Sequence, residues 1–177
     1  YNWTNNTPSI GLAASGSGDI ASFTATNASN APVVATITVT PGYTNAGTTC
    51  TGTPRTFTIT VNPTPTVDPV ANQAVCNNAP TTAVNFTGFV PGTVYNWTNS
   101  DPSIGLAASG TGNIASFTAT NPGTAPVTAT ITVTPSYTNA GTTCTGTPIT
   151  FDITVNPTGQ VNQPASQVVC NNTPTAP

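Results

Sequence analysis

The chain has 177 residues and is almost without charge. Only 3% of the residues are charged, against about 25% in a typical soluble domain. The charged residues are Asp19, Asp68, Asp101, Asp152 and Arg55. One arginine is too few to neutralise the phosphates of a nucleic acid or an anionic membrane, so neither is expected as a partner. No apolar run approaches the ~20 residues of a membrane span, and no basic signal segment opens the chain, so no membrane insertion is expected.

The polar and apolar composition favours a folded β protein. The chain has 40 Thr, 20 Asn, 18 Pro and 15 Gly, and 36% of its residues are apolar. Disordered chains combine low hydrophobicity with high net charge, whereas this chain has a net charge of -3 and regularly spaced Val, Ile and Phe.

The sequence repeats itself after 94 residues. Residues 1–83 align with residues 95–177 without a gap, and 62 of these 83 positions are identical. Because this period exceeds the 20 to 50 residues of a solenoid unit, it predicts whole domains in tandem. A Pro-rich linker follows Pro63, and its counterpart follows Pro157. The predicted organisation is the C-terminal part of one domain (1–63), a complete domain (64–157) and the start of a following one (158–177). We expect the chain to be a window on a longer array, or neighbouring molecules to complete each other.

Short strands are predicted throughout the complete domain. In residues 127–133, Val, Ala and Ile alternate with Thr, which indicates a strand with one apolar face. Clusters of Pro, Gly, Ser, Thr and Asn at 90–93, 109–113 and 121–123 indicate turns. Seven short strands and no helix-forming run predict an all-β, immunoglobulin-like β-sandwich. In chain order, the expected strands are 73–75, 83–89, 94–98, 104–107, 114–120, 127–133 and 151–155.

The two tryptophans are predicted core anchors. Trp97 falls in the third expected strand, where an immunoglobulin-like sandwich places its core tryptophan, and Trp3 occupies the same position one period earlier. In the alternative, Tyr95 and Trp97 would form an exposed platform for a sugar ring. We favour the core, because a small unit rich in Ala and Thr would be underpacked without them.

The four cysteines repeat with the same period, without metal-ligand spacing. Cys50 corresponds to Cys144, and Cys76 to Cys170. With no histidine and no Cys-x-x-Cys, a zinc site is not expected. We predict a Cys76–Cys144 disulfide, with free buried thiols as the alternative, and assign Cys50 and Cys170 partners outside the chain or in a neighbouring molecule. Such disulfides indicate an oxidising, extracytoplasmic compartment.

No catalytic site is predicted. Histidine, glutamate and lysine, the usual general acids and bases, are absent. No acid recurs between repeats: Asp19 aligns with Asn113, Asp101 with Thr7, Asp68 with Asn162, and Asp152 with Thr58. The chain is therefore not expected to be an enzyme or to bind a metal or cofactor.

Several segments resemble a known repeat family. The segments 67–77 (VDPVANQAVCN), 95–98 (YNWT), 114–120, 129–135 and 154–157 (TVNP) are similar to the tandem PKD-like (immunoglobulin-like) repeats of large Bacteroidota cell-surface adhesins, including gliding-motility adhesins. The resemblance covers essentially the whole chain. It implies export by type IX secretion and display at the cell surface, while the activity of the parent protein does not carry over.

Three functions remain as hypotheses. The favoured one is a structural stalk, in which neighbouring repeats hold a distal adhesive domain away from the cell; surface polysaccharide would be bound only by domains outside this chain. The second is a self-assembling filament of molecules joined head to tail. Residues 158–177 would supply the first strand of residues 1–63 in the next molecule, and Cys170 would bond to Cys50 there. The third is a carbohydrate-binding module that uses Tyr43, Tyr137 or the Trp pair.

Overall fold

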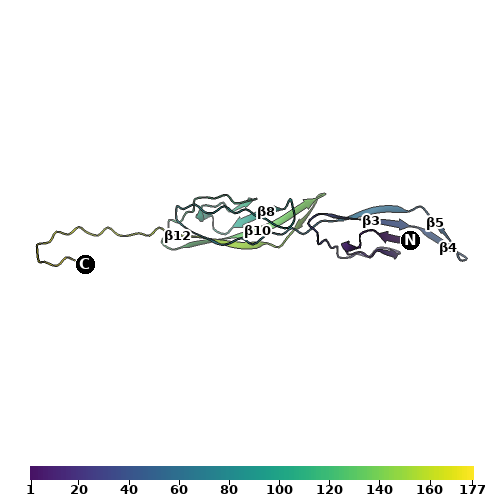
Figure 1. The fold of residues 1–177 in the computed structure, drawn as a ribbon, viewed down its shortest axis with the longest axis horizontal. Helices are drawn as coiled ribbons and strands as arrows, with labels where there is room; N and C mark the ends of the chain where they lie inside the picture. Colours follow the sequence, from purple (N-terminus) through teal and green to yellow (C-terminus); the bar gives the residue numbers. More distant parts are fainter.

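The computed structural model describes residues 1–177 and is nearly all β. Two β units lie end to end, and the last 20 residues leave the second unit as an extended tail (Figure 1). The only helices are two short 3-10 turns, η1 (Pro8–Ile10) and η2 (Pro102–Ile104). No helix has the length and apolar character needed to cross a membrane.

The first unit, residues 1–63, contains a four-stranded antiparallel sheet. Its order is β2-β1-β3-β6, so β6 forms one edge. A separate hairpin of β4 and β5 projects from the end of the molecule (Figure 1). The strands are β1 (Asn2–Asn5), β2 (Ser15–Ser17), β3 (Val33–Thr40), β4 (Gly42–Asn45), β5 (Thr48–Thr51) and β6 (Arg55–Val61).

The second unit, residues 64–157, repeats this sheet and adds a strand, and we name it the complete unit for that added strand. The order is β7-β12-β10-β8-β9, with β11 paired to the far half of β10. The added strand β7 is parallel to β12, whereas the other pairs are antiparallel. The strands are β7 (Gln73–Cys76), β8 (Val94–Asn99), β9 (Ser109–Thr111), β10 (Val127–Asn139), β11 (Thr142–Thr145) and β12 (Ile149–Asn156).

A second, irregular layer covers the sheet of the complete unit. Two chain segments, 79–86 and 113–119, meet through isolated antiparallel bridges at Pro80 with Thr118 and at Val84 with Ile114. Val84 and Ile114 exchange both backbone hydrogen bonds, at 2.8 and 3.0 Å. The unit is thus a sheet closed by a loosely paired layer.

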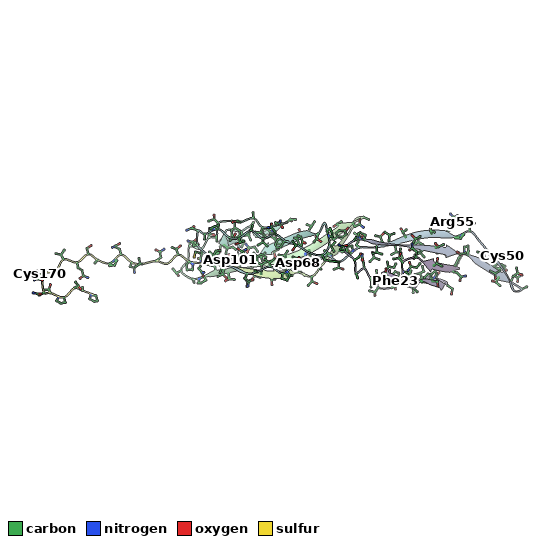
Figure 2. The ribbon with its side chains drawn as sticks, in the orientation of Figure 1. Phe23, Cys50, Arg55, Asp68, Asp101 and Cys170 are labelled. Atoms are coloured by element: carbon green, nitrogen blue, oxygen red, sulfur yellow. The ribbon has the colours of Figure 1, made fainter.

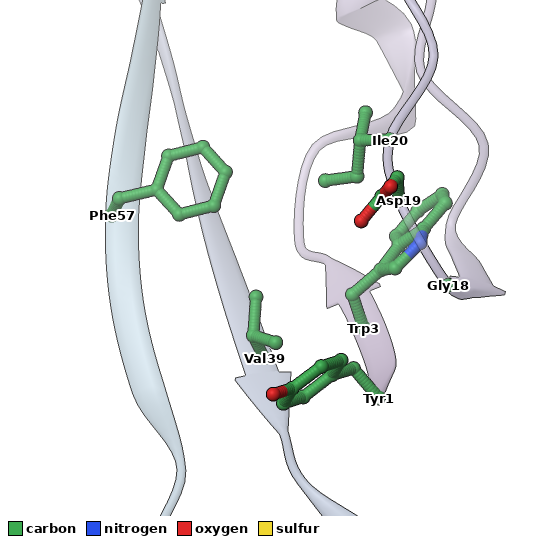
Figure 3. A pocket seen from close by; sticks show the side chains of 7 residues that line it. All are labelled: Tyr1, Trp3, Gly18, Asp19, Ile20, Val39 and Phe57. Atoms are coloured by element: carbon green, nitrogen blue, oxygen red, sulfur yellow. The ribbon is translucent and has the colours of Figure 1, made fainter.

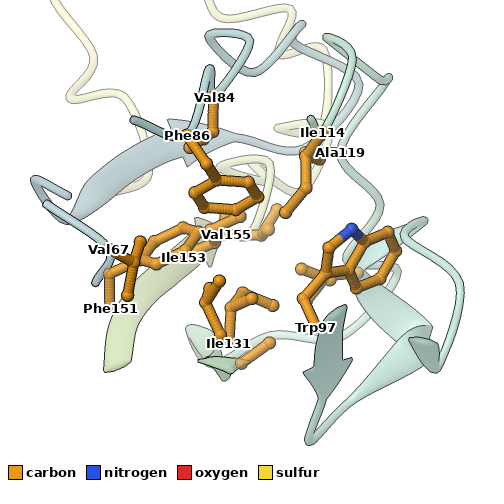
Figure 4. Packing of buried hydrophobic residues seen from close by; sticks show 13 residues of the cluster. Val67, Val84, Phe86, Trp97, Ile114, Ala119, Ile131, Phe151, Ile153 and Val155 are labelled. Carbon is orange, nitrogen blue, oxygen red and sulfur yellow. The ribbon is translucent and has the colours of Figure 1, made fainter. Parts of the chain in front are cut away.

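The apolar alternation places one face of the sheet in the core. Ala129, Ile131 and Val133 of β10 are fully buried, whereas the threonines between them lie on the other face. Phe151, Ile153 and Val155 of β12 are buried in the same way. Val84, Phe86 and Trp97 belong to the same cluster, which has 13 buried residues in all (Figure 4). The all-β prediction is therefore confirmed.

Some of the predicted strands are wrong. Residues 104–107 do not form a strand, because Pro102 starts the turn η2 and Gly105 ends it with φ +97°. Residues 83–89 and 114–120 contribute only the single bridges described above. The turn predicted at 109–113 begins with the short strand β9, which pairs with β8. Local turn residues thus exclude the strand predicted at 104–107, whereas tertiary packing decides the other short segments.

Candidate functional site

Two of the acidic side chains accept hydrogen bonds from threonine hydroxyls. Asp68 accepts a hydrogen bond from Thr87 Oγ1 at 2.6 Å, and Asp152 accepts one from Thr130 Oγ1 at 2.8 Å. No three His, Cys, Asp or Glu side chains gather where they could hold a metal ion. The carboxylates of Asp68 and Asp152 thus act as hydrogen-bond acceptors for neighbouring threonine hydroxyls.

Two titratable groups have perturbed pKa values, each for a structural reason. Hydrogen bonds from Ser103, first from its side chain and then from its backbone N–H, hold the pKa of the Asp101 carboxyl below its usual value. Asp101 caps η2 by accepting these hydrogen bonds with its ionised carboxylate. The cap is therefore fully formed above the ordinary pKa of an aspartate and is lost as the pH falls through the lowered pKa of Asp101. Burial, and then the negative charge of Asp68, raise the pKa of Tyr95.

The first unit has an open apolar face (Figure 3). A pocket of about 370 Å³ lies between Tyr1, Trp3, Ile20, Val39 and Phe57. The complete unit buries the counterpart of Phe57 under residues 67–86, so that Phe151 is 2% exposed whereas Phe57 is 46% exposed. Burying one such phenylalanine is worth about 1.5 to 3 kcal/mol. The difference between the two phenylalanines therefore reflects the segment 67–86, which lies over the second sheet.

The edge of the first sheet beside this face is free. In the complete unit, β7 lies parallel along β12, with Val75 opposite Val155 and Cys76 opposite Asn156. The strand β6 is the counterpart of β12, and no strand pairs with its outer side. An unpaired edge presents backbone N–H and C=O groups that can bind an added strand.

The two units meet through a direct polar contact. Asn139 Nδ2, in the β10–β11 hairpin, donates to Asn62 Oδ1 at 2.8 Å, and Asn62 Nδ2 donates to Asn139 O at 3.5 Å. Pro63 and Pro65 of the linker are fully buried. A pocket of about 250 Å³, the junction pocket, opens at this contact and is lined by Ile59, Thr60, Val61, Asn62, Asn139 and Cys144, among others. The hairpin of one unit therefore holds the end of the preceding one.

The predicted Cys76–Cys144 disulfide is not present, and all four cysteines are free. Cys76 lies beside Asn156 at the end of β12, while Cys144 lies in β11, before β12 begins. The eight residues of β12 separate the two ends of the unit by about 26 Å, and a disulfide tolerates only about 4.4 to 6.8 Å between Cα atoms. The sequence pattern did not reveal that β7 runs parallel to β12. This direction puts Cys76 at the end of the unit opposite to Cys144.

The other two cysteines lie at opposite ends of the molecule (Figure 2). Cys50 is in the projecting β4–β5 hairpin, and Cys170 is in the exposed tail. The tail makes few contacts with the rest of the chain, and Val161, Val168 and Val169 are exposed.

The aromatic residues proposed as sugar contacts have different surroundings. Trp3 and Trp97 are each 7% exposed and belong to the cores of the two units, so neither forms an open platform. Tyr43 is 71% exposed in the first hairpin, whereas Tyr137 is half-buried. Each tyrosine lies across its hairpin from a cysteine, Tyr43 from Cys50 and Tyr137 from Cys144.

Sequence reasoning missed the polar residues that organise these sites. Asn62 and Asn139 both recur one period away, as Asn156 and Asn45, and this recurrence is the signal that could have identified them. Buried Asn121 was missed as well, although it recurs as Asn27. Its Nδ2 donates to Val155 O at 2.7 Å and ties the end of β12 to a loop.

Searches with protein-family models and against curated proteins found no match to this sequence.

Proposed function

We propose that the chain is a structural spacer: tandem immunoglobulin-like, PKD-like sandwich units in the stalk of a large secreted surface adhesin. The observation that carries this proposal is the junction, where Asn139 of one unit holds Asn62 of the preceding one and the linker prolines are buried. In this proposal the amide contact and the fixed φ of the linker prolines restrict rotation between the units and keep them in line. The elongated arrangement in Figure 1 supports the same role.

The two-layered complete unit supports the immunoglobulin-like assignment. Trp97 lies in the core on β8, and residues 79–86 and 113–119 close the opposite side. The resemblance to surface-adhesin repeats adds type IX export, an extracellular location and a part in gliding motility to the proposal. It assigns no enzymatic activity, and any polysaccharide binding belongs to other domains of the parent protein.

Small-angle X-ray scattering tests the spacer. The Asn139→Ala variant should have a smaller radius of gyration and a broader distance distribution than the wild type, because the amide pair at the junction is lost. Asn45→Ala is the matched control: Asn45 holds the same position in the first hairpin, where it contacts no preceding unit. Unchanged scattering of Asn139→Ala, or a flexible wild type, would contradict a rigid spacer.

A further inference from the structure

We propose that the complete unit holds the linker, residues 63–66, in a seat formed by Gly88 and Gly146. Two linker residues, Pro65 and Thr66, then set how stiff the joint between the units is. This inference deepens the spacer role and rests on it, because a fixed joint matters in a molecule that spans a distance. Every residue that forms the seat or lies in it belongs to the linker or to the complete unit.

The linker has the burial pattern of a strand. Every second residue along it is buried, namely Pro63, Pro65 and Val67, and the threonines between them are exposed. A period of two is that of an extended chain with one face on a core. The prolines also fix their own φ and hold the residues before them in extended backbone. The linker therefore enters the complete unit as an extended segment packed along one face.

Two glycines make room for the linker backbone. A Cβ atom on Gly146 would lie 2.9 Å from the carbonyl carbon of Pro65 and closer still to its oxygen. A Cβ atom on Gly88 would have the same relation to the carbonyl group of Thr66. Both positions are far inside van der Waals contact with backbone atoms, so only glycine allows this close approach. Two consecutive linker carbonyls are thus held, one by the segment before β8 and one by the turn between β11 and β12.

Hydrogen bonds hold the linker in this seat. Directly after Gly88, the backbone N–H of Phe89 donates to Thr66 Oγ1 at 2.9 Å. Directly before Gly88, Thr87 O accepts a bond from the backbone N–H of Asp68 at 2.8 Å. Thr87 Oγ1 in turn donates to Asp68 Oδ2 at 2.6 Å. The chain on both sides of Gly88 is thus bonded to the linker or to the residues just after it.

The β10–β11 pair fixes the other side of the seat and also carries the contact with the first unit. Gly146 follows β11, and its N–H donates to Pro135 O at 2.9 Å. Pro135 is fully buried in β10, between the part that pairs with β12 and the part that pairs with β11. The same strand pair carries Asn139, whose Nδ2 donates to Asn62 Oδ1. The amide pair and the seat therefore fix the linker at its start and at its end.

The two linkers of this chain differ at the two residues that lie in the seat. Gly159 stands one period after Pro65, and Gln160 stands one period after Thr66. Glycine lacks the fixed φ of proline, and glutamine carries its side-chain oxygen further from the backbone than threonine does. Both changes weaken the hold of such a seat. Linker sequence alone can thus make one joint stiff and another pliable while the units keep their own residues.

Nuclear magnetic resonance of the 177-residue chain tests the seat through two separate measurements. Hydrogen exchange at the Phe89 N–H reports whether the linker is seated, and amide relaxation reports whether the units tumble together. The variant Pro65→Gly with Thr66→Gln places the residues of the second linker in the seat. Its Phe89 N–H should exchange at least about tenfold faster than in the wild type, because its acceptor is lost. The units should then tumble separately, whereas Thr64→Gln, at an exposed position of the same linker, should change neither measurement.

A second pair of variants tests the glycine side of the seat. Gly146→Ala should displace the linker and speed exchange at the Phe89 N–H in the same way. Gly52→Ala is the matched control, because the two added Cβ atoms meet a neighbouring proline ring alike, Pro135 Cγ at 3.0 Å and Pro41 Cγ at 2.9 Å. Only the Cβ atom on Gly146 also meets a linker carbonyl. Gly52→Ala should therefore leave both the fold of its unit and the joint unchanged.

The outcomes separate the seat from the spacer. Unchanged exchange at the Phe89 N–H in both Gly146→Ala and the double linker variant would overturn the seat. Units that still tumble together in the double variant would overturn the role given to Pro65 and Thr66, since the amide pair alone would then fix the joint. Wild-type units that tumble separately while the Phe89 N–H stays protected would overturn the spacer and leave the seat in place. The linker variants keep every glycine of the seat, and Trp97 fluorescence verifies that the complete unit is folded.

Discussion

At the scale of single residues, small side chains set the packing of the tryptophans. Gly110 lies opposite Trp97 in the β8–β9 pair, and the indole ring covers it. A Cβ atom on Gly110 would lie 2.2 Å from Cζ2 of Trp97, which is far inside van der Waals contact. The same relation holds between Gly16 and Trp3, so both units use a glycine to make room for the ring.

The Gly110→Ala variant should therefore destabilise the complete unit by about 1 to 3 kcal/mol, the usual cost of overpacking. Urea unfolding followed by fluorescence measures this in a Trp3→Phe background, where Trp97 alone reports. Gly42→Ala is the control, because a Cβ at that strand position meets its nearest atom at 3.8 Å. Equal stability of the two variants would contradict the close packing.

At the scale of elements, the segment before β8 decides whether a sheet face is closed. Phe86 packs on Tyr95 with ring centroids 5.6 Å apart, and its N–H donates to Asn113 Oδ1 at 2.9 Å. The first unit has the same sheet and no such segment over it, so Phe57 and Val39 line an open pocket. The sheet alone thus leaves its apolar face half covered.

Phe86→Ala should cost the complete unit about 3 to 5 kcal/mol, as large-to-small changes in a core do. The measurement is again urea unfolding reported by Trp97. Phe89→Ala provides the comparison, because Phe89 belongs to the same segment and is 56% exposed. Its effect should stay below about 1 kcal/mol. A loss as large as that of Phe86→Ala would mean that the segment is held as one unit and not by its buried ring.

At the scale of the whole molecule, the units are joined by uncharged groups. Asn62 and Asn139 form the contact, and the one arginine, Arg55, lies in β6 away from it. Salt screens interactions between charges and leaves amide hydrogen bonds nearly unaffected.

The radius of gyration from small-angle scattering should therefore stay constant between about 0.05 and about 1 M NaCl, over which the Debye length falls several-fold. A charged junction, made by Asn62→Asp with Asn139→Lys, is the matched comparison and should become salt-dependent. Salt-induced compaction of the wild type would show that charge holds the units apart.

The repeat, the all-β class and the apolar faces could all be predicted from the amino-acid sequence. These follow from local pattern: a two-residue alternation needs no knowledge of distant segments, and 62 identities in 83 positions reveal the period directly. The burial of Ile131 and Ile153 could be predicted in this way.

Which strand ends and which units meet could not be predicted, and the fold shows it. The parallel pairing of β7 with β12 puts Cys76 beside Asn156, and the packing of one unit on the next brings Asn62 to the hairpin that carries Cys144. Strand direction and contacts between units depend on chain segments far apart in sequence, and a periodic pattern reads the same in either direction. The pattern therefore identified the cysteines as a repeated feature, while their separation by the length of a strand was visible only in the fold.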